Sequence, residues 1–462
     1  MIAPSASQVM PDSTAIKLPS DAEIHKMIAN RVDVIGGLED GIGIVVGIVG
    51  PEGRRVISYG HVNQGDPRLL DGDTGFEIAS ATKVFTALLL ADMVEKGEVT
   101  LVVPVAKYLP AGVKLPDRKG RSITLLDLAT HTSGLPFMPA LNDSLAVKDP
   151  SLLYHFLAGY KLSRDIGATW DYSNIGYWLL GEALAHRSGM DFETLLTTRV
   201  IVPLRLTGTA ITPSPKMKAN LAVGHDAALR PAPYFPSLPV YSLMPAAGGL
   251  VSTTNDLLTF LSAVMGYERS PFARAMAAML SARRPKPHLG EEQALGWIVI
   301  REGDDQLIFH DGGSLGFASS VAWDPQRRLG VVVLSNQSTG VNDIARHLLR
   351  PDFPLEQPTA AKRTEIVLDS TALRVCAGRY EALGEGIFKI VFEGDSLTFQ
   401  APTDWGLPKL RLRPESRLDF FAAELPLRVT FQTDGDGRVN AILVHPPRGQ
   451  RAKLAKRVSP DR

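Results

Sequence analysis

The order of apolar and polar residues along the chain predicts strands at both ends of one long region, with helices between them. Two apolar runs predict a pair of strands at 43–50 and 54–60, joined by the turn Pro51-Glu52-Gly53. Later runs predict four strands and then a helix, at 295–301, 306–309, 317–323, 329–334 and 342–349. Helical patterns cover 21–34 and most of 120–270. This arrangement predicts an α+β fold, in which an antiparallel sheet is flanked by helices and accompanied by a helical subdomain.

The pattern changes at residues 350–358, where three of nine residues are proline and a semi-rigid linker is expected. Beyond this stretch, short alternating segments recur at intervals of about ten residues, separated by turn signals such as Glu393-Gly394-Asp395. Such spacing is typical of a small antiparallel β-barrel or sandwich. We therefore expect a flexible N-terminus at 1–20, a first domain at 21–350, a linker at 351–365 and a β domain at 366–462.

Composition narrows the class of protein. The 462 residues exceed what one core usually holds, which supports two domains. Lysine plus arginine and aspartate plus glutamate balance at 49 each, so we expect no nucleic-acid partner. Cys376 is the only cysteine, which makes an intramolecular disulfide impossible.

The N-terminal sequence bears on location. Its first residues lack the basic and apolar segments of a secretory signal. The longest early apolar stretch, at 41–49, is too short to span a bilayer. We therefore expect a cytoplasmic protein without a membrane span, or a periplasmic or secreted one if the chain was trimmed.

The most informative short motif is Ser80-Ala81-Thr82-Lys83, which opens a strongly apolar run. Read as a helix, the run starts at Ser80 and stops near Gly97, so the Lys83 amine lies one turn above the Ser80 hydroxyl. Serine is a weak nucleophile until a neighbouring base takes its proton, and burial in an apolar helix should lower the pKa of Lys83. Backbone N–H groups at a helix N-terminus also favour developing negative charge. The alternative is an ordinary serine N-cap.

A second motif is Tyr172-Ser173-Asn174, which lies on a predicted loop just before a helix at 175–186. A tyrosine could relay the proton between Ser80 and the leaving group. The Asn174 amide could hold a substrate carbonyl. The alternative is a buried tyrosine with its hydroxyl bonded, next to an asparagine that caps the helix.

A third motif is His310-Asp311-Gly312-Gly313, placed just after a predicted strand. Two adjacent glycines let the backbone approach a ligand closely. An oxyanion hole needs two aimed N–H donors, and those of Ser80 and Gly313 are the candidates. The alternative is a hairpin turn with a surface histidine.

The three motifs follow one another in an order that resembles the serine β-lactamase and penicillin-binding protein superfamily. The likeness is to its branch of class C-like β-lactamases, D-aminopeptidases and esterases, through S-x-x-K at Ser80, Y-x-N at Tyr172 and H-x-G at His310. Segments 128–136 and 247–256 also look like structural signatures of that branch, the first of them shaping the rim of the site. The resemblance covers about residues 20–350 and implies the fold of β-lactamases and transpeptidases.

The resemblance also implies roles for these residues. The implied catalytic residues are Ser80, Lys83 and Tyr172. The implied substrate-binding residues are Asn174, His310 and Gly312. His131 is implied to be a packing or hydrogen-bonding residue rather than the base. No metal and no cofactor are implied, and the partner is a small-molecule or short-peptide acyl substrate.

The third motif departs from the Lys-Thr-Gly of many penicillin-recognising enzymes, because His310 stands in place of the lysine. Histidine supplies a positive charge only in part near neutral pH, so it should bind a substrate carboxylate less well. This favours a serine hydrolase that cleaves amide bonds of small peptides or amino-acid amides, as D-aminopeptidases and amidases do. A carboxylesterase, a weak class C-like β-lactamase, and an acyltransferase or peptide cyclase remain alternatives, as does a catalytically silent binding or scaffold protein.

The C-terminal β domain resembles the lipocalin-like barrel appended to some D-aminopeptidases and related peptide-processing hydrolases. In such relatives the extra domain can lean over the active site and shape which acyl group enters. This likeness also favours a peptidase or amidase over an esterase. The sequence carries no signal for the oligomeric state.

Overall fold

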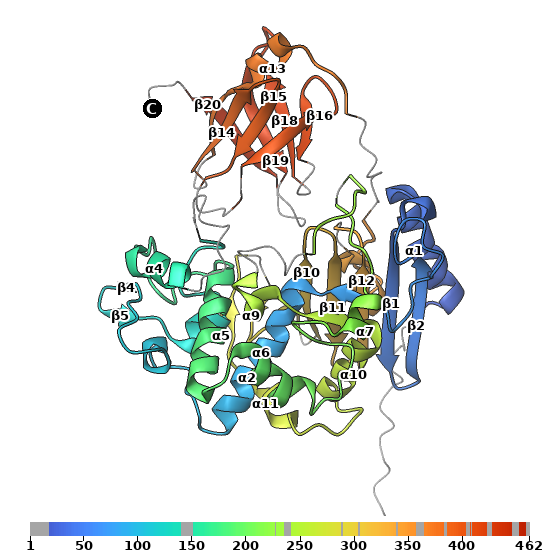
Figure 1. Cartoon of the computed structure of the whole chain (residues 1–462), viewed down its shortest axis with the longest axis vertical. Helices are drawn as coiled ribbons and strands as arrows, with labels where there is room; N and C mark the ends of the chain where they lie inside the picture. The colour runs from blue at the N-terminus through green and yellow to red at the C-terminus, as the bar shows by residue number, and fades with distance from the viewer. Residues whose placement is uncertain are drawn as a thin grey trace, which may run out of the picture.

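The computed structural model describes most of the chain, and Figure 1 shows how its elements are arranged. The described residues are 18–139, 151–226, 228–234, 242–287, 290–303, 305–338, 341–356, 365–382, 386–402, 407, 409–422, 427–445 and 452–458. Residues 1–17 of the predicted flexible N-terminus and residues 357–364 of the predicted linker lie outside them.

Within these residues, eight strands form one antiparallel sheet that is the framework of the first 350 residues. From one edge to the other they are β2 (Gly53–Gly60), β1 (Gly43–Gly50), β12 (Leu329–Ser335), β11 (Ala318–Asp324), β10 (Asp305–Gly313), β9 (Ile298–Glu302), β8 (Glu291–Gln293) and β7 (Arg284–Pro285). Strands from the two ends of this region lie side by side, because β1 pairs with β12 from Ile44↔Ser335 to Val49↔Gly330. The predicted antiparallel sheet is confirmed.

Both faces of the central strands β1, β11 and β12 are covered, which explains why β1 and β12 are almost continuously apolar. Every residue of these three strands is buried. In β1, Val45 and Val49 belong to the core beneath the helical region, whereas Ile44, Val46 and Ile48 belong to the core beneath the helices of the opposite face. Alternate side chains of one strand therefore serve two separate cores.

Two helices, α1 (Asp21–Ile35) and α12 (Asn342–Leu349), cover the outer face of the sheet. The other face carries the helical region, which Figure 1 shows gathered around α2, α5 and α9. Its α-helices are α2 (Thr82–Glu95), α3 (Leu125–Ala129), α4 (Ser151–Gly159), α5 (Asn174–Ser188), α6 (Phe192–Leu196), α7 (Pro215–Ala219), α9 (Pro245–Gly248), α10 (Thr254–Val264) and α11 (Ala273–Ala278). A two-stranded sheet of β3 (Gly75–Glu77) and β6 (Val251–Thr253) joins α2 to α10.

The C-terminal region forms a closed antiparallel barrel that follows α13 (Ser370–Cys376). In its described part the strands are β13 (Gly378–Ala382), β14 (Gly386–Glu393), β15 (Ser396–Gln400), β16 (Leu410–Pro414), β17 (Asp419–Ala422), β18 (Arg428–Thr433), β19 (Val439–His445) and β20 (Lys453–Val458). The barrel has a core of its own, in which rings such as Phe388, Phe399, Phe420 and Phe431 are buried. The predicted small β-barrel is confirmed, and Figure 1 shows it as a body apart from the sheet.

Two sequence-based boundaries need correction. The helix that carries Lys83 was predicted to begin at Ser80. In the structure this helix, α2, begins at Thr82, and Ser80 lies in the preceding 3-10 turn η2 (Ala79–Ala81). His310 was expected after a strand, but it lies inside β10 and is only 2% exposed. Among the helices that the structure describes, none is long and apolar enough to cross a membrane.

Candidate active site

Ser80 lies where the small β3–β6 sheet leads into α2. The residue before it, Ala79, has a φ of +44°, a left-handed conformation that is unfavourable for a residue with a side chain. Strained backbone of this kind collects at functional sites. The turn holds Ser80 at 7% exposure, two residues before the first residue of α2. Ser80 therefore precedes the helix proper, while its hydroxyl still lies one turn from Lys83.

Lys83 is completely buried, and its amine has three oxygen neighbours. Nζ lies 3.3 Å from the Ser80 hydroxyl, 2.8 Å from Asn174 Oδ1 and 2.5 Å from the carbonyl oxygen of Ala247. Three segments far apart in the sequence therefore meet at one nitrogen atom. The predicted proximity of Ser80 and Lys83 is present, and Asn174 joins them.

Tyr172 and Asn174 flank the residue that caps α5. Ser173 Oγ accepts a hydrogen bond from Gly176 N–H at 2.9 Å, which fixes the first turn of the helix. Asn174 is the first residue of α5 and points its amide oxygen to Lys83. The ring of Tyr172 also lies beside Lys83, with Nζ 4.9 Å from the ring centroid. The alternative interpretation of Asn174 as the helix cap is wrong, because Ser173 caps the helix and Asn174 contacts the lysine.

Residues 131–138, within and just after the first structural-signature segment, hold the Tyr172–Asn174 turn through backbone groups. The carbonyl of His131 accepts from Asp171 N–H at 2.8 Å, and the carbonyl of Phe137 accepts from Asn174 N–H at 3.0 Å. Ser173 Oγ donates to the carbonyl of Pro136 at 2.7 Å. The segment predicted to shape the rim thus positions the second motif directly.

The second structural-signature segment holds α2 in a similar way. Besides the Ala247 carbonyl on Lys83, the carbonyl of Ala246, the residue just before the segment, accepts from the Thr86 hydroxyl at 2.8 Å. Leu250 N–H donates to Thr82 Oγ1 at 3.1 Å, and Leu250 O accepts from Ile78 N–H at 3.0 Å. Sequence reasoning singled out this segment but found none of these contacts, since a main-chain acceptor leaves no residue-specific signal.

The third motif reaches the site along β10. A Cβ atom added to Gly312 would lie 2.1 Å from the carbonyl oxygen of Ile78, so only glycine permits this approach of β10 to the Ser80 turn. Gly313, the last residue of β10, pairs with Ala318 of β11. His310 is buried, and its Nδ1 donates to the carbonyl of Asp311 at 2.8 Å, because a carbonyl can only accept.

The rings of Tyr172 and Tyr177 lie beside the lysine, and the ring of His131 packs against both of them. His131 stacks on Tyr172, with ring centroids 4.4 Å apart and an interplanar angle of 30°, and its ring lies 5.1 Å from that of Tyr177. The ring centroid of Tyr177 lies 5.4 Å from Lys83 Nζ. Burial, followed by the nearby charges of Lys83, His310 and Lys286, holds the pKa of His131 well below its ordinary value of 6.5.

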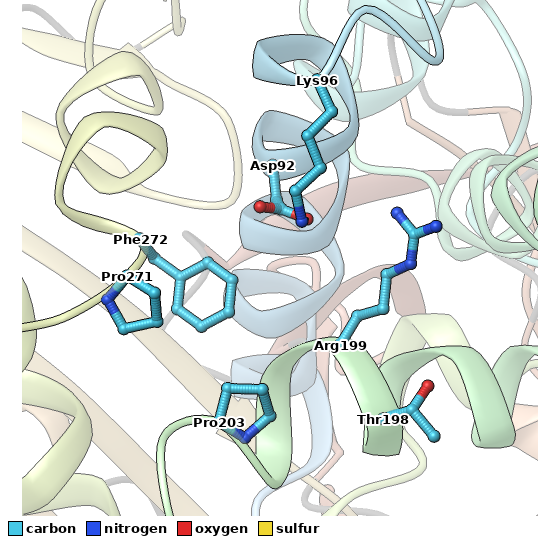
Figure 2. A pocket seen from close by; sticks show the side chains of 7 residues that line it. All are labelled: Asp92, Lys96, Thr198, Arg199, Pro203, Pro271 and Phe272. Carbon is cyan, nitrogen blue, oxygen red and sulfur yellow. The ribbon is translucent and has the colours of Figure 1, made fainter.

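A cavity of about 310 Å³ lies at the opposite end of α2 (Figure 2). It is lined by Asp92, Lys96, Thr198, Arg199, Pro203, Pro271 and Phe272. Fourteen helical residues span about 20 Å, so this cavity is remote from Ser80. Its cations are already paired, Lys96 with Asp92 at 2.6 Å and Arg199 with Glu98 at 2.7 Å. Hydrogen-bond geometry, rather than cavity size, therefore identifies the candidate site.

Metal ligands are the next feature to consider. No three histidine, cysteine, aspartate or glutamate side chains come together as ligands among the described residues. The groups that converge near Ser80 are an amine, an amide, a phenol and main-chain carbonyls. Such groups are suited to moving protons and holding polar substrate atoms.

Comparison with known proteins finds similar sequences and structures for most of the chain. A family model described as Beta-lactamase matches residues 32–351. The D-alanyl-D-alanine-carboxypeptidase/endopeptidase AmpH of Escherichia coli strain K12 is 29% identical over 335 residues, which cover 66% of this chain and 84% of AmpH. A beta-lactamase of Pseudomonas fluorescens is 26% identical over 350 residues, covering 68% of this chain and 94% of that protein. A crystal structure of a class C beta lactamase from Rhodobacter sphaeroides superposes with a TM-score of 0.61 and 25% identity, over 72% of this chain and 97% of that one.

Proposed function

The chain belongs to the beta-lactamase family and is a serine hydrolase, and from this premise we propose that it cleaves amide bonds of small peptides or amino-acid amides through an acyl-enzyme on Ser80. The relative AmpH is named as a carboxypeptidase and endopeptidase, and this supports an amide rather than an ester as the substrate of the present chain. The appended barrel supports the same choice by its likeness to the extra domain of some D-aminopeptidases.

The observation that carries the proposal is the set of partners around Lys83. A neutral amine has two N–H donors and one lone pair. The carbonyl of Ala247 and Oδ1 of Asn174 accept from both donors, at 2.5 and 2.8 Å. Ser80 Oγ lies 3.3 Å from the same nitrogen, so a neutral Lys83 can accept the hydroxyl proton on its lone pair. The arrangement suits a base that removes this proton as Oγ attacks the substrate carbonyl.

Tyr172 completes the proton path in this proposal. Its ring lies beside Lys83 Nζ, at 4.9 Å from the centroid. The proton taken from Ser80 passes by way of Lys83 and Tyr172 to the leaving amine as the C–N bond breaks. A water molecule then gives its proton back along the same path while its oxygen attacks the acyl carbon, which releases the acid and restores Ser80.

The developing oxyanion is assigned to the N–H groups of Ser80 and Gly313. The close contact of Gly312 with Ile78 supports this assignment, because it brings the end of β10 against the turn that carries Ser80. Fixed backbone donors stabilise the tetrahedral intermediate more than the flat substrate carbonyl. Loss of one such donor typically lowers turnover by about 10²–10³-fold.

His310 is assigned to substrate binding, the role that the resemblance implies. Its Nδ1 donates to the carbonyl of Asp311, and the ring is buried in β10. A histidine carries a positive charge only in part near neutral pH, so it holds a substrate carboxylate less firmly than the lysine of a Lys-Thr-Gly motif would. This favours recognition of an amide or amine, and it argues against the strong carboxylate binding of a potent β-lactamase.

Intact mass spectrometry tests the acyl-enzyme. Incubation with a fluorophosphonate or a penicillin should add one adduct to the native chain and none to Ser80→Ala. A native chain that takes up no adduct, or a Ser80→Ala variant that takes up as much, would favour a silent binding protein. A panel of D- and L-aminoacyl anilides, D-alanyl-D-alanine, p-nitrophenyl esters and a chromogenic cephalosporin then separates the substrates. Turnover of the cephalosporin alone would refute the amide proposal.

A further inference from the structure

His131 contacts the Tyr172 segment at three points. Its carbonyl accepts from the N–H of Asp171 at 2.8 Å, and its Nδ1 accepts from the N–H of Ser173 at 3.1 Å. Its ring stacks on the ring of Tyr172 itself, with centroids 4.4 Å apart. One residue therefore holds the peptide on both sides of Tyr172 and one face of its side chain.

The conformation of His131 is costly for a residue that only fills space. Its φ of +56° is left-handed, and the residue is 1% exposed. Because Nδ1 accepts a hydrogen bond, the proton of the neutral ring is on Nε2. Within the part of the chain that the structure describes, the buried Nε2 has no hydrogen-bond partner. An apolar ring would avoid this last cost, but it would leave the N–H of Ser173 without its acceptor.

The contact with Ser173 requires the neutral ring. The titratable groups that face His131 are Lys83 of α2, His310 of β10 and Lys286, which follows β7, and the phenol rings of Tyr172 and Tyr177 pack against it. Burial opposes a positive charge on the ring first, and a positive charge on any of these basic groups opposes it further. A protonated ring would set a second N–H against the N–H of Ser173.

We propose that His131 is a positioning residue for this reaction, which acts by fixing the Tyr172 phenol beside Lys83. The proposal rests on the proposed role of Tyr172 in proton transfer. His131 does not take the proton from Ser80, and no bond to substrate is assigned to it. Its effect on the reaction passes entirely through the position of Tyr172.

Two substitutions separate the contacts. His131→Asn keeps an acceptor near Nδ1 and a residue type that tolerates left-handed backbone, but it removes the stacked ring. His131→Phe keeps the ring and removes the acceptor. A misplacement of about 1 Å can lower a rate by about 100-fold, so each variant should lower kcat/KM by about 10- to 100-fold on an aminoacyl anilide, mainly through kcat. His155→Asn, at an exposed position of α4, is the matched control and should leave the rate unchanged.

A double-mutant cycle with Tyr172→Phe distinguishes positioning from general structural support. If His131 acts through Tyr172, either His131 variant should change kcat/KM by less than about twofold in the Tyr172→Phe background. Equal losses in the two backgrounds, or no loss in the native background, would overturn the proposal. If Tyr172→Phe alone leaves the rate unchanged, the proposed function fails at Tyr172 and takes the His131 inference with it. Should His131→Asn fail to fold by near-UV circular dichroism, His131→Phe completes the same cycle.

Discussion

Replacing Gly312 by alanine should disable the site without touching any predicted catalytic side chain. The added Cβ would lie 2.1 Å from the carbonyl oxygen of Ile78 and 2.4 Å from Ser319 Oγ, where ordinary contact begins at 3.4 Å. The φ of Gly312 is not left-handed, so alanine suffers no backbone strain there and the whole effect is steric. The carbonyl of Ile78 also holds the Ser319 hydroxyl at 2.8 Å, which leaves it little freedom to move.

The expected size of the effect follows from this overlap. Relief requires a shift of 3.4 − 2.1 = 1.3 Å between β10 and the turn that carries Ser80. A displacement of about 1 Å can cost about 100-fold in rate, and the loss of one oxyanion donor about 10²–10³-fold. We therefore expect kcat/KM to fall by about 10²–10³-fold. Overpacking of this kind should also cost about 1–3 kcal/mol of stability.

Rates on a p-nitrophenyl ester, the rate of fluorophosphonate labelling and urea unfolding measure the three consequences. Gly159→Ala is the matched control, because a Cβ there meets nothing within 4 Å. Gly248→Ala touches the same turn from another side, at an ordinary 3.5 Å from the carbonyl carbon of Ala79, and should be tolerated. A folded Gly312→Ala protein with kcat/KM within about threefold of native, or a Gly248→Ala protein damaged equally, would refute the steric argument.

Three further predictions concern stability and reactivity. Glu182 accepts a hydrogen bond from Tyr154 at 3.0 Å, and burial raises the pKa of its carboxyl group above the ordinary value of 4.5. At neutral pH the ionised carboxylate is therefore less favourable in the folded state than in the unfolded state. Glu182→Gln should therefore raise Tm at pH 7, and the gain should vanish below about pH 4, where both states are protonated; an equal gain at both pH values would contradict this. Asp343→Ala removes the ion pair that joins α1 to α12 at 2.5 Å and leaves the buried Arg31 without it. Urea unfolding should show a loss of about 3–5 kcal/mol in the free energy of unfolding, with kcat unchanged. A loss under about 1 kcal/mol would show that the pair is dispensable. Burial raises the pKa of the Cys376 thiol to about 11. A disulfide reagent at pH 8 should therefore label this thiol only as denaturant unfolds the barrel domain. Rapid labelling of the native protein would argue against the burial of Cys376.

Much of the fold could be predicted because its signals are local. The central strands β1 and β12 are almost continuously apolar, and α12 was predicted with the bounds it has, Asn342–Leu349. The prediction missed β20, in which only Ala455 is buried and Leu454 is 49% exposed, so it has no apolar alternation to detect. It also missed β7 and β8, because they are only two and three residues long and mostly polar. Edge and closing strands are defined by their neighbours more than by their own sequence.

The same distinction applies to the site. Ser80 and Lys83 could be paired from sequence because they are three residues apart, on one side of a helical turn. The carbonyl of Ala247 could not be found in this way, since every residue has a carbonyl and the one that is used depends on the path of a distant segment. The roles of the two signature segments became visible only as main-chain contacts to Lys83 and to the Tyr172–Asn174 turn.

Small residues are the sequence signal that such main-chain contacts leave behind. A Cβ on Gly296 would lie 2.9 Å from the carbonyl of Lys83, one on Gly312 would lie 2.1 Å from the carbonyl of Ile78, and one on Gly181 would meet Ala246 at 2.4 Å. Each of these glycines lets one segment reach the Ser80–Lys83 turn or the helix that supports it. A glycine that faces a catalytic turn therefore constrains the site as strictly as a polar side chain does. The polar motifs indicate which chemistry is available, and the glycines between them determine whether the groups can come close enough to perform it.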